Sequence, residues 1–148
     1  MCRLEPELRR GKERMNKYAF AFILALAATR GLAQTPASPA PTGLWRVADG
    51  TAIVRISRCG AGLCGVIAAA PPPEPGKPSA LGKKILIDMR RREETWRGRI
   101  FNLEDGRIYD GEISLKSADR LKITGCLPGG GACGGEVWRR EPVKPASR

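Results

Sequence analysis

Two short glycine-rich turns, each with a cysteine on both sides, constrain this chain more than any other feature. The first reads Cys59-Gly-Ala-Gly-Leu-Cys64, and the second runs from Cys126 through Leu-Pro-Gly-Gly-Gly-Ala to Cys133. Runs rich in β-branched residues lead into both turns, and strand-like runs joined by a short Gly-rich turn are typical of β-hairpins. We therefore expect a β-sheet protein in which cysteines flank two of the hairpins.

The N-terminal residues have the pattern of a secretory signal peptide. A short basic segment at Met15-Asn-Lys is followed by an apolar run over residues 18–28 and by Gly31-Leu-Ala33. This order matches the n-region, h-region and small-residue cleavage site of a signal peptide, with cleavage expected between Ala33 and Gln34. The apolar run is shorter than the ~20 residues that cross a bilayer, and an uncleaved anchor is the alternative. We expect a periplasmic or secreted protein, with Met1 or Met15 as its start.

In an exported protein, the number of cysteines indicates whether disulfides form. The chain has 5 cysteines, and loss of Cys2 with the N-terminal segment leaves an even number in an oxidising compartment, which favours disulfides. We expect the pairs Cys59–Cys64 and Cys126–Cys133, because each pair flanks one turn. A four-cysteine zinc site is the alternative, but its paired ligands are usually two to four residues apart. We expect neither a metal nor a cofactor.

After residues 1–33, the sequence divides into a Pro/Ala-rich tether (34–42), a β domain (43–141) and a disordered tail (142–148). Eight short strand candidates occupy the domain, at residues 43–47, 52–57, 66–69, 85–89, 95–101, 108–115, 120–126 and 137–140. A meander of such strands leaves two open edges, which closure into a barrel removes. We expect an all-β, antiparallel up-and-down barrel, with a β-sandwich as the alternative. In such a meander the two cysteine-flanked turns lie at opposite ends.

An ordered set of motifs resembles an exported bacterial family, domain of unknown function 2147 (DUF2147). The set comprises Gly43-x-Trp45, Cys64-Gly-Val-Ile, Trp96-x-Gly-x-Ile100, Asp105-Gly-x-x-Tyr109, Leu121-x-Ile-x-Gly-Cys126 and Trp138-x-Arg140. The resemblance implies a lipocalin-like barrel that binds a small apolar ligand. Family members usually carry an Asp-x-x-Asn segment before the fourth strand, and residues 71–84 contain neither Asp nor Asn.

The lipocalin-like resemblance also implies a structural plug at one end of the barrel. In such barrels a Gly-x-Trp on the first strand meets an arginine of the last strand, which lies across the indole. Gly43, Trp45 and Arg140 would form this plug, through a cation–π contact worth ~1 kcal/mol or more when desolvated. Arg139, one residue away, would point to the other face.

The sequence favours a binding module over an enzyme. It contains no histidine, which excludes imidazole acid–base chemistry. Asp105, Asp110 and Glu112 remain as acids, and carboxylates on half-buried strands usually face water. We therefore expect no catalytic residues.

We expect an interior that either is filled or binds a small apolar ligand, with Arg55 or Arg99 as a carboxylate partner at the mouth. The expected lining residues are apolar or aromatic and come from four strands: Val54, Ile56, Ile100, Tyr109, Ile113, Leu121 and Ile123. The net charge of +11 supports a second alternative, an envelope module that contacts anionic lipid or polysaccharide through a basic turn at Arg90-Arg-Arg92. We expect no nucleic-acid partner, and the sequence does not define the oligomeric state.

Overall fold

The computed structural model describes residues 39–143. These residues form eight strands: β1 (Gly43–Arg46), β2 (Ile53–Cys59), β3 (Gly62–Ala69), β4 (Lys84–Arg92), β5 (Thr95–Phe101), β6 (Ile108–Ser117), β7 (Arg120–Cys126) and β8 (Cys133–Arg140). The expected signal peptide and its cleavage site lie outside the described residues, as do residues 34–38 and 144–148. Within residues 39–143 there is no helix long and apolar enough to span a membrane.

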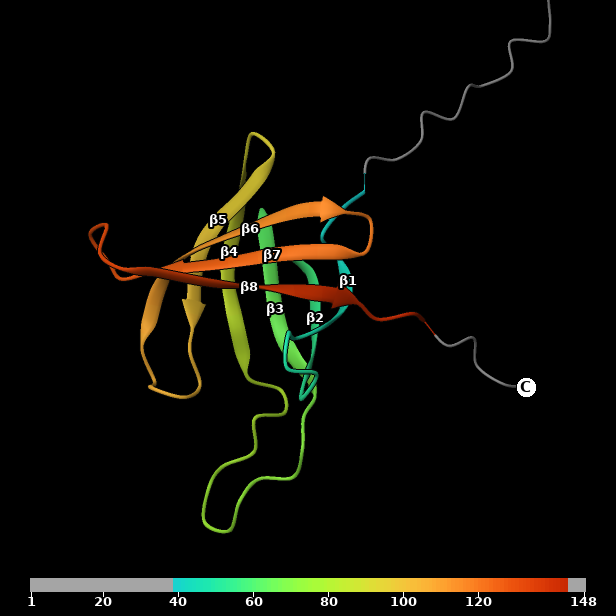
Figure 1. Cartoon of the computed structure of the whole chain (residues 1–148), viewed down its shortest axis with the longest axis vertical. Coiled ribbons are helices and arrows are strands. Elements are labelled where there is room, and N and C mark those ends of the chain that lie inside the picture. The colour runs from blue at the N-terminus through green and yellow to red at the C-terminus, as the bar shows by residue number, and fades with distance from the viewer. Residues whose placement is uncertain (1–38, 144–148) are drawn as a thin grey trace, which may run out of the picture. The chain divides into compact units, whose positions relative to one another are not determined.

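The eight strands form one closed antiparallel barrel in which each strand pairs with the next along the chain (Figure 1). The barrel closes where Trp45 and Arg46 of β1 pair with Arg140 and Arg139 of β8. The prediction of an up-and-down barrel is therefore confirmed, and the sandwich alternative is wrong. Of the two ends, one carries the tight turns after β2, β4 and β6 and is called the hairpin end. The other carries the longer loops after β1, β3, β5 and β7 and is called the loop end.

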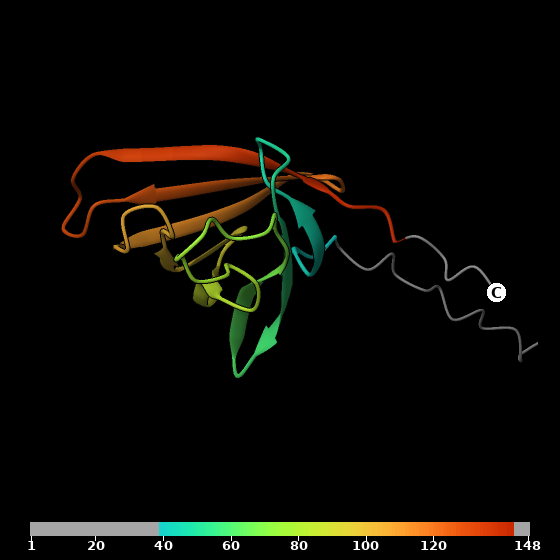
Figure 2. The same ribbon diagram turned by 90° about the horizontal axis from the view of Figure 1, so that it is seen from below.

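Alternation of apolar and polar residues places one face of each strand inside the barrel. In β7, Leu121 and Ile123 are buried, whereas Arg120 before them and Lys122 between them are exposed. In Figure 2, β2 and β3 lie on one side of the interior, and β7 and β8 lie on the other. The core between them consists of large apolar side chains, the most fully buried being Trp45, Val54, Ile56, Leu86, Met89, Ile113 and Leu121.

A row of glycines crosses the inner face of four neighbouring strands. Gly98 of β5 pairs with Gly111 of β6, which pairs with Gly125 of β7, which pairs with Gly134 of β8. A Cβ atom at Gly98 would lie 2.6 Å from the carbonyl oxygen of Ile87, whereas a Cβ at Gly134 would have nothing within 4 Å. The barrel is therefore tightly packed at β5 and open at β8. Gly98 is thus a close-packing point, where the missing side chain lets the backbone of β4 approach.

Strand β4 extends further than the sequence indicates. Arg90, Arg91 and Arg92 were expected to form a turn, but they pair with β5, and the turn consists of the next two residues, Glu93 and Glu94. Glu93 has a φ of 54°. The register with β5 shifts between Ile87 and Arg90. Asp88, inside this irregularity, has a φ of 47°, and such bulges bend a strand locally.

The packed domain also begins earlier than the predicted boundary at Gly43. Pro41 is fully buried, and its carbonyl oxygen accepts a hydrogen bond from the Trp45 indole Nε1–H at 2.8 Å. The carbonyl oxygens of Ala40 and Thr42 accept hydrogen bonds from Arg140. The last residues of the predicted tether therefore cover the hairpin end of the barrel.

Candidate functional site

A cavity of about 830 Å³ opens at the loop end of the barrel. Its walls come from the β1–β2 turn, the β5–β6 loop, the β7–β8 hairpin and the adjoining parts of β3, β4, β5 and β6. Pockets for small molecules typically measure about 300–1,000 Å³. The cavity is therefore large enough for a small organic ligand.

The strand pairing explains why the cavity lies at this end. Strand β1 has only four residues, and it pairs with β8 only through Arg139 and Arg140. Residues 133–138 of β8 consequently have a strand partner, β7, on one side only. The inward-facing Gly125 and Gly134 line the cavity and bring no side chains into it. The incomplete β1–β8 seam and the missing side chains together leave the space open.

Most of the cavity wall is apolar. Aliphatic side chains come from Val47, Ala52, Ile67, Ile85, Ile123 and Leu127, and aromatic rings from Phe101, Tyr109 and Trp138. The residues of the wall that carry a charge at neutral pH are Asp49, Glu104, Glu136 and Arg107. An apolar wall with a few polar groups is the usual composition of a small-molecule site.

Hydrogen bonds fix two of the aromatic rings. The Tyr109 hydroxyl donates to Asp105, and the Trp138 indole Nε1–H donates to Glu136. The bond from Tyr109, with a second from the Arg107 backbone N–H, lowers the pKa of the Asp105 carboxyl. The same bond to Asp105 raises the pKa of the Tyr109 hydroxyl. At neutral pH the pair is therefore a neutral phenol bonded to a carboxylate.

The β1–β2 turn is held in a similar way. Asp49 accepts hydrogen bonds from the Thr51 hydroxyl at 2.7 Å and from the Thr51 backbone N–H at 2.9 Å. These two bonds, the hydroxyl first, lower the pKa of the Asp49 carboxyl. The cavity therefore has an ionised carboxylate on its β1–β2 wall at neutral pH.

The seven residues predicted to line a ligand site separate into two groups. Ile100, Tyr109 and Ile123 line the cavity. The other four do not line it, because they lie in the packed core: Val54, Ile56, Ile113 and Leu121. The sequence-based list did not include Phe101, Trp138 or the residues of the β1–β2 turn. Alternation identifies inward-facing positions, but it does not show at which end of the barrel the interior is filled.

The predicted carboxylate partners lie elsewhere. Arg55 is exposed between the buried Val54 and Ile56, and Arg99 is exposed on β5 opposite Asp110. Neither arginine lines the cavity, so the expectation that one of them lies at its mouth is wrong. Glu112 also faces outward, where it forms an ion pair with Arg97 at 2.6 Å.

The predicted plug is present at the hairpin end. The Arg140 guanidinium carbon lies 4.2 Å from the centroid of the Trp45 ring. Its nitrogens donate to the carbonyl oxygens of Ala118, Thr42 and Ala40 at 2.6, 2.8 and 2.9 Å. Gly43 has a φ of 125°, and a Cβ there would lie 2.8 Å from Arg140 Nη1. Arg140 therefore joins the start of β1, the β6–β7 turn and the end of β8.

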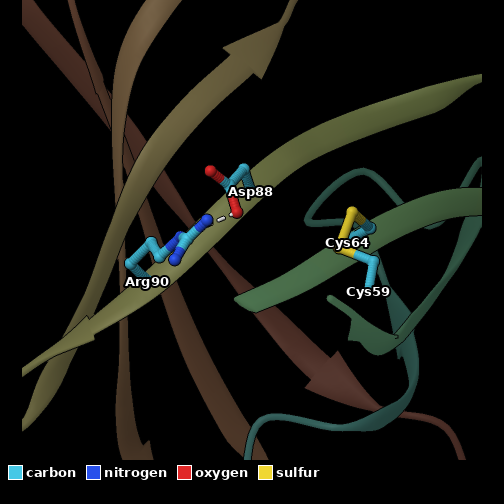
Figure 3. The surroundings of a disulfide bond; sticks show 4 residues. All are labelled: Cys59, Cys64, Asp88 and Arg90. Atoms are coloured by element: carbon cyan, nitrogen blue, oxygen red, sulfur yellow. Dashed lines mark hydrogen bonds and ion pairs between the residues drawn. A yellow bond between two sulfur atoms is a disulfide. The ribbon is translucent and has the colours of Figure 1, made fainter. Parts of the chain in front are cut away.

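Both expected disulfides are present, which excludes the four-cysteine zinc site. Cys59 and Cys64 are bonded across the β2–β3 turn, and Cys126 and Cys133 across the β7–β8 loop. The first lies at the hairpin end, near the Asp88–Arg90 ion pair on β4 (Figure 3). The second lies at the loop end, where Cys133 lines the cavity. Two disulfides indicate that the protein folds in an oxidising environment.

The predicted basic turn does not form a free cationic patch. Arg90 is paired with Asp88 at 2.9 Å, and the Arg91 guanidinium lies 5.3 Å from the centroid of the Trp96 ring. Arg91 Nε also donates to the Glu93 carbonyl oxygen. Two of the three arginines therefore have partners within the chain. Contact with an anionic envelope surface stays a prediction.

Comparisons with known proteins agree with this geometry. In fold, the structure is similar to protein HP1028 from the human pathogen Helicobacter pylori, which is described as belonging to the lipocalin family. The TM-score is 0.59 at 15% sequence identity, over 71% of this chain and 85% of that one. No curated protein matches the sequence. The family model described as "Uncharacterized protein conserved in bacteria (DUF2147)" matches residues 43–140, which cover the whole barrel. The chain therefore belongs to the DUF2147 family, and its domain has a lipocalin-like fold.

Proposed function

We propose that this protein is a non-enzymatic binding module that holds a small apolar ligand in the cavity at the loop end. The observation that carries the proposal is the open cavity of about 830 Å³ with a mainly apolar wall. The opposite end is closed by the plug and the core. A barrel that is closed at one end and hollow at the other can take up a ligand without rearranging its strands.

The rigidity of the wall supports this function. Cys126–Cys133 fixes the β7–β8 hairpin beside the cavity. Backbone bonds from Asn102 N–H to Arg107 O and from Gly106 N–H to Asn102 O close the β5–β6 loop. A site that is formed before binding loses less conformational entropy when the ligand enters. We further propose that the protein acts in the periplasm or after secretion, where both disulfides persist.

A variant that fills the cavity tests the proposal directly. Gly134 has open space at its Cβ position and no positive φ, so Gly134→Leu should fold and place its side chain in the cavity. The matched control is Lys122→Leu, which adds the same side chain on the exposed face of β7. Binding is measured as the fluorescence of Nile red, a neutral apolar dye, and folding as the melting temperature.

We expect saturable dye binding to the wild type and to Lys122→Leu. Gly134→Leu should bind about 5- to 150-fold more weakly, since overpacking costs ~1–3 kcal/mol. Equal binding by a folded Gly134→Leu variant, or no saturable binding to the wild type, would contradict the proposal.

A further inference from the structure

Most charged groups in the cavity wall are negative, although the chain as a whole is positive. The chain is basic, with a net charge of +11. The cavity wall nevertheless contains the three carboxyls of Asp49, Glu104 and Glu136 and a single cation, Arg107. Asp105 adds a further carboxylate next to the wall through its bond to Tyr109. A ligand therefore meets a negatively charged cavity in a positively charged protein.

Aromatic rings line the same space. Three of the five aromatic side chains among residues 39–143 lie in the cavity wall, namely Phe101, Tyr109 and Trp138. The faces of aromatic rings attract cations, and aromatic pockets are the usual receptors for quaternary ammonium groups. Trp138 is also bonded to Glu136, so a ring and a carboxylate lie side by side. Both the aromatic rings and the carboxylates therefore favour a positively charged ligand.

From these two observations we infer that the cavity selects ligands with an apolar body and a cationic amine or ammonium head. This inference rests on the proposed function and adds the charge of the ligand. A carboxylate ligand such as a fatty acid would find only Arg107 as a cationic partner in the wall, because Arg55 and Arg99 lie on the outer face. An amine would meet three carboxylates and three rings, while its chain contacts the aliphatic wall.

Three probes with the same twelve-carbon chain separate charge from apolarity. Dodecyltrimethylammonium carries a cationic head, dodecanol a neutral one and dodecanoate an anionic one. Each is titrated into the oxidised protein at pH 7 below the concentration at which it aggregates or separates from solution, and heat is measured by calorimetry. We expect affinity to fall from cation to alcohol to anion by about two- to fivefold at each step, as exposed charge pairs produce. The preference for the cation should shrink in ~0.5 M salt, where such pairs are screened.

A variant without a charge at position 136 tests whether the Glu136 carboxylate contacts the cationic head. Glu136→Gln keeps an oxygen that can accept from Trp138 and removes the charge. It should lower the affinity for the cation about two- to fivefold and leave the affinity for the alcohol unchanged. The control, Glu112→Gln, removes a carboxylate that is paired with Arg97 on the outer face. It should change neither affinity.

The outcomes separate the inference from the proposed function. If the alcohol binds and the anion binds as well as the cation or better, the charge selectivity is wrong and the apolar site stands. If Glu136→Gln binds the cation as tightly as wild type, Glu136 does not recognise the head. If none of the three probes binds, the proposed function fails, and the inference fails with it.

Discussion

Removing the Arg140 guanidinium should destabilise the barrel more than any other change of a single charged residue at the hairpin end. The side chain donates three hydrogen bonds to backbone carbonyl oxygens and lies over the Trp45 ring. These partners belong to three separate parts of the chain: residues 40–42, β1 and the β6–β7 turn. Apart from the Arg140 side chain, β1 is joined to β8 by only two residue pairs and to Glu141 by its bonds with Leu44 and Arg46.

The loss of stability on removing the Arg140 side chain can be estimated from its contacts. Hydrogen bonds that involve a charged group contribute ~1.5–3 kcal/mol each, and two of the three acceptor residues, Ala40 and Ala118, are exposed, which favours the lower value. The cation–π contact adds ~1 kcal/mol. Because contacts of one side chain are not additive, we expect Arg140→Ala to lower the free energy of unfolding by ~3–4 kcal/mol. Arg140→Lys keeps the charge but loses the planar fork, and should cost ~2 kcal/mol.

Urea denaturation followed by tryptophan fluorescence measures these differences. The control is Arg139→Ala on the outer face of the same strand, directly opposite Arg46 and Arg120. Since like charges opposite one another are unfavourable in a sheet, we expect this variant to lie within ~0.5 kcal/mol of wild type or to be slightly more stable. An Arg140→Ala variant within ~1 kcal/mol of wild type would show that the plug does not hold the barrel closed.

Two further predictions concern the glycine row and the cavity wall. Gly98→Ala should lower the free energy of unfolding by ~1–3 kcal/mol, because its Cβ would lie 2.6 Å from Ile87 O. Gly134→Ala should raise it by up to ~1 kcal/mol, and thermal unfolding compares the two. The Asp105 carboxyl has a lowered pKa, so its stabilising effect is present above about pH 4 and is lost as the pH falls. The Tyr109 hydroxyl has a raised pKa, so its effect is lost as the pH rises above about 10. Tyr109→Phe should flatten the stability curve on both sides, and an unchanged curve would contradict this reasoning.

The fold could be predicted from the sequence because its signals are local. The alternation in β7 defines its inner face. Short turns bring Cys59 close to Cys64, and Cys126 close to Cys133, without any knowledge of the rest of the barrel. The plug was predictable for a different reason, since Trp45 and Arg140 are 95 residues apart and only the family resemblance connects them.

The cavity could not be located from the sequence, because its position depends on contacts between distant strands. Gly98 and Gly134 look alike in the sequence, but the backbone of β4 lies against the first, and the second lies in the part of β8 that the short β1 does not reach. Arg55 and Arg99 were expected at the cavity mouth, but each lies between inward-facing residues of its strand and therefore faces outward. Pro41 looked like part of a linker because its burial depends on the Trp45 indole, which donates to its carbonyl oxygen.

The proposed division of the barrel gives one end to a ligand site and the other to a structural closure. An amide nitrogen–proton NMR spectrum, recorded while dodecanol is titrated into the isotope-labelled oxidised protein, tests it residue by residue. If the ligand binds at the loop end, signals should shift saturably in the segments 47–52, 102–107 and 132–136, which contribute residues to the cavity wall. Signals of Trp45, Arg140 and residues 118–120 should stay unchanged. Shifts centred on the hairpin end, or on the outward-facing residues of β6 and β7, would contradict it.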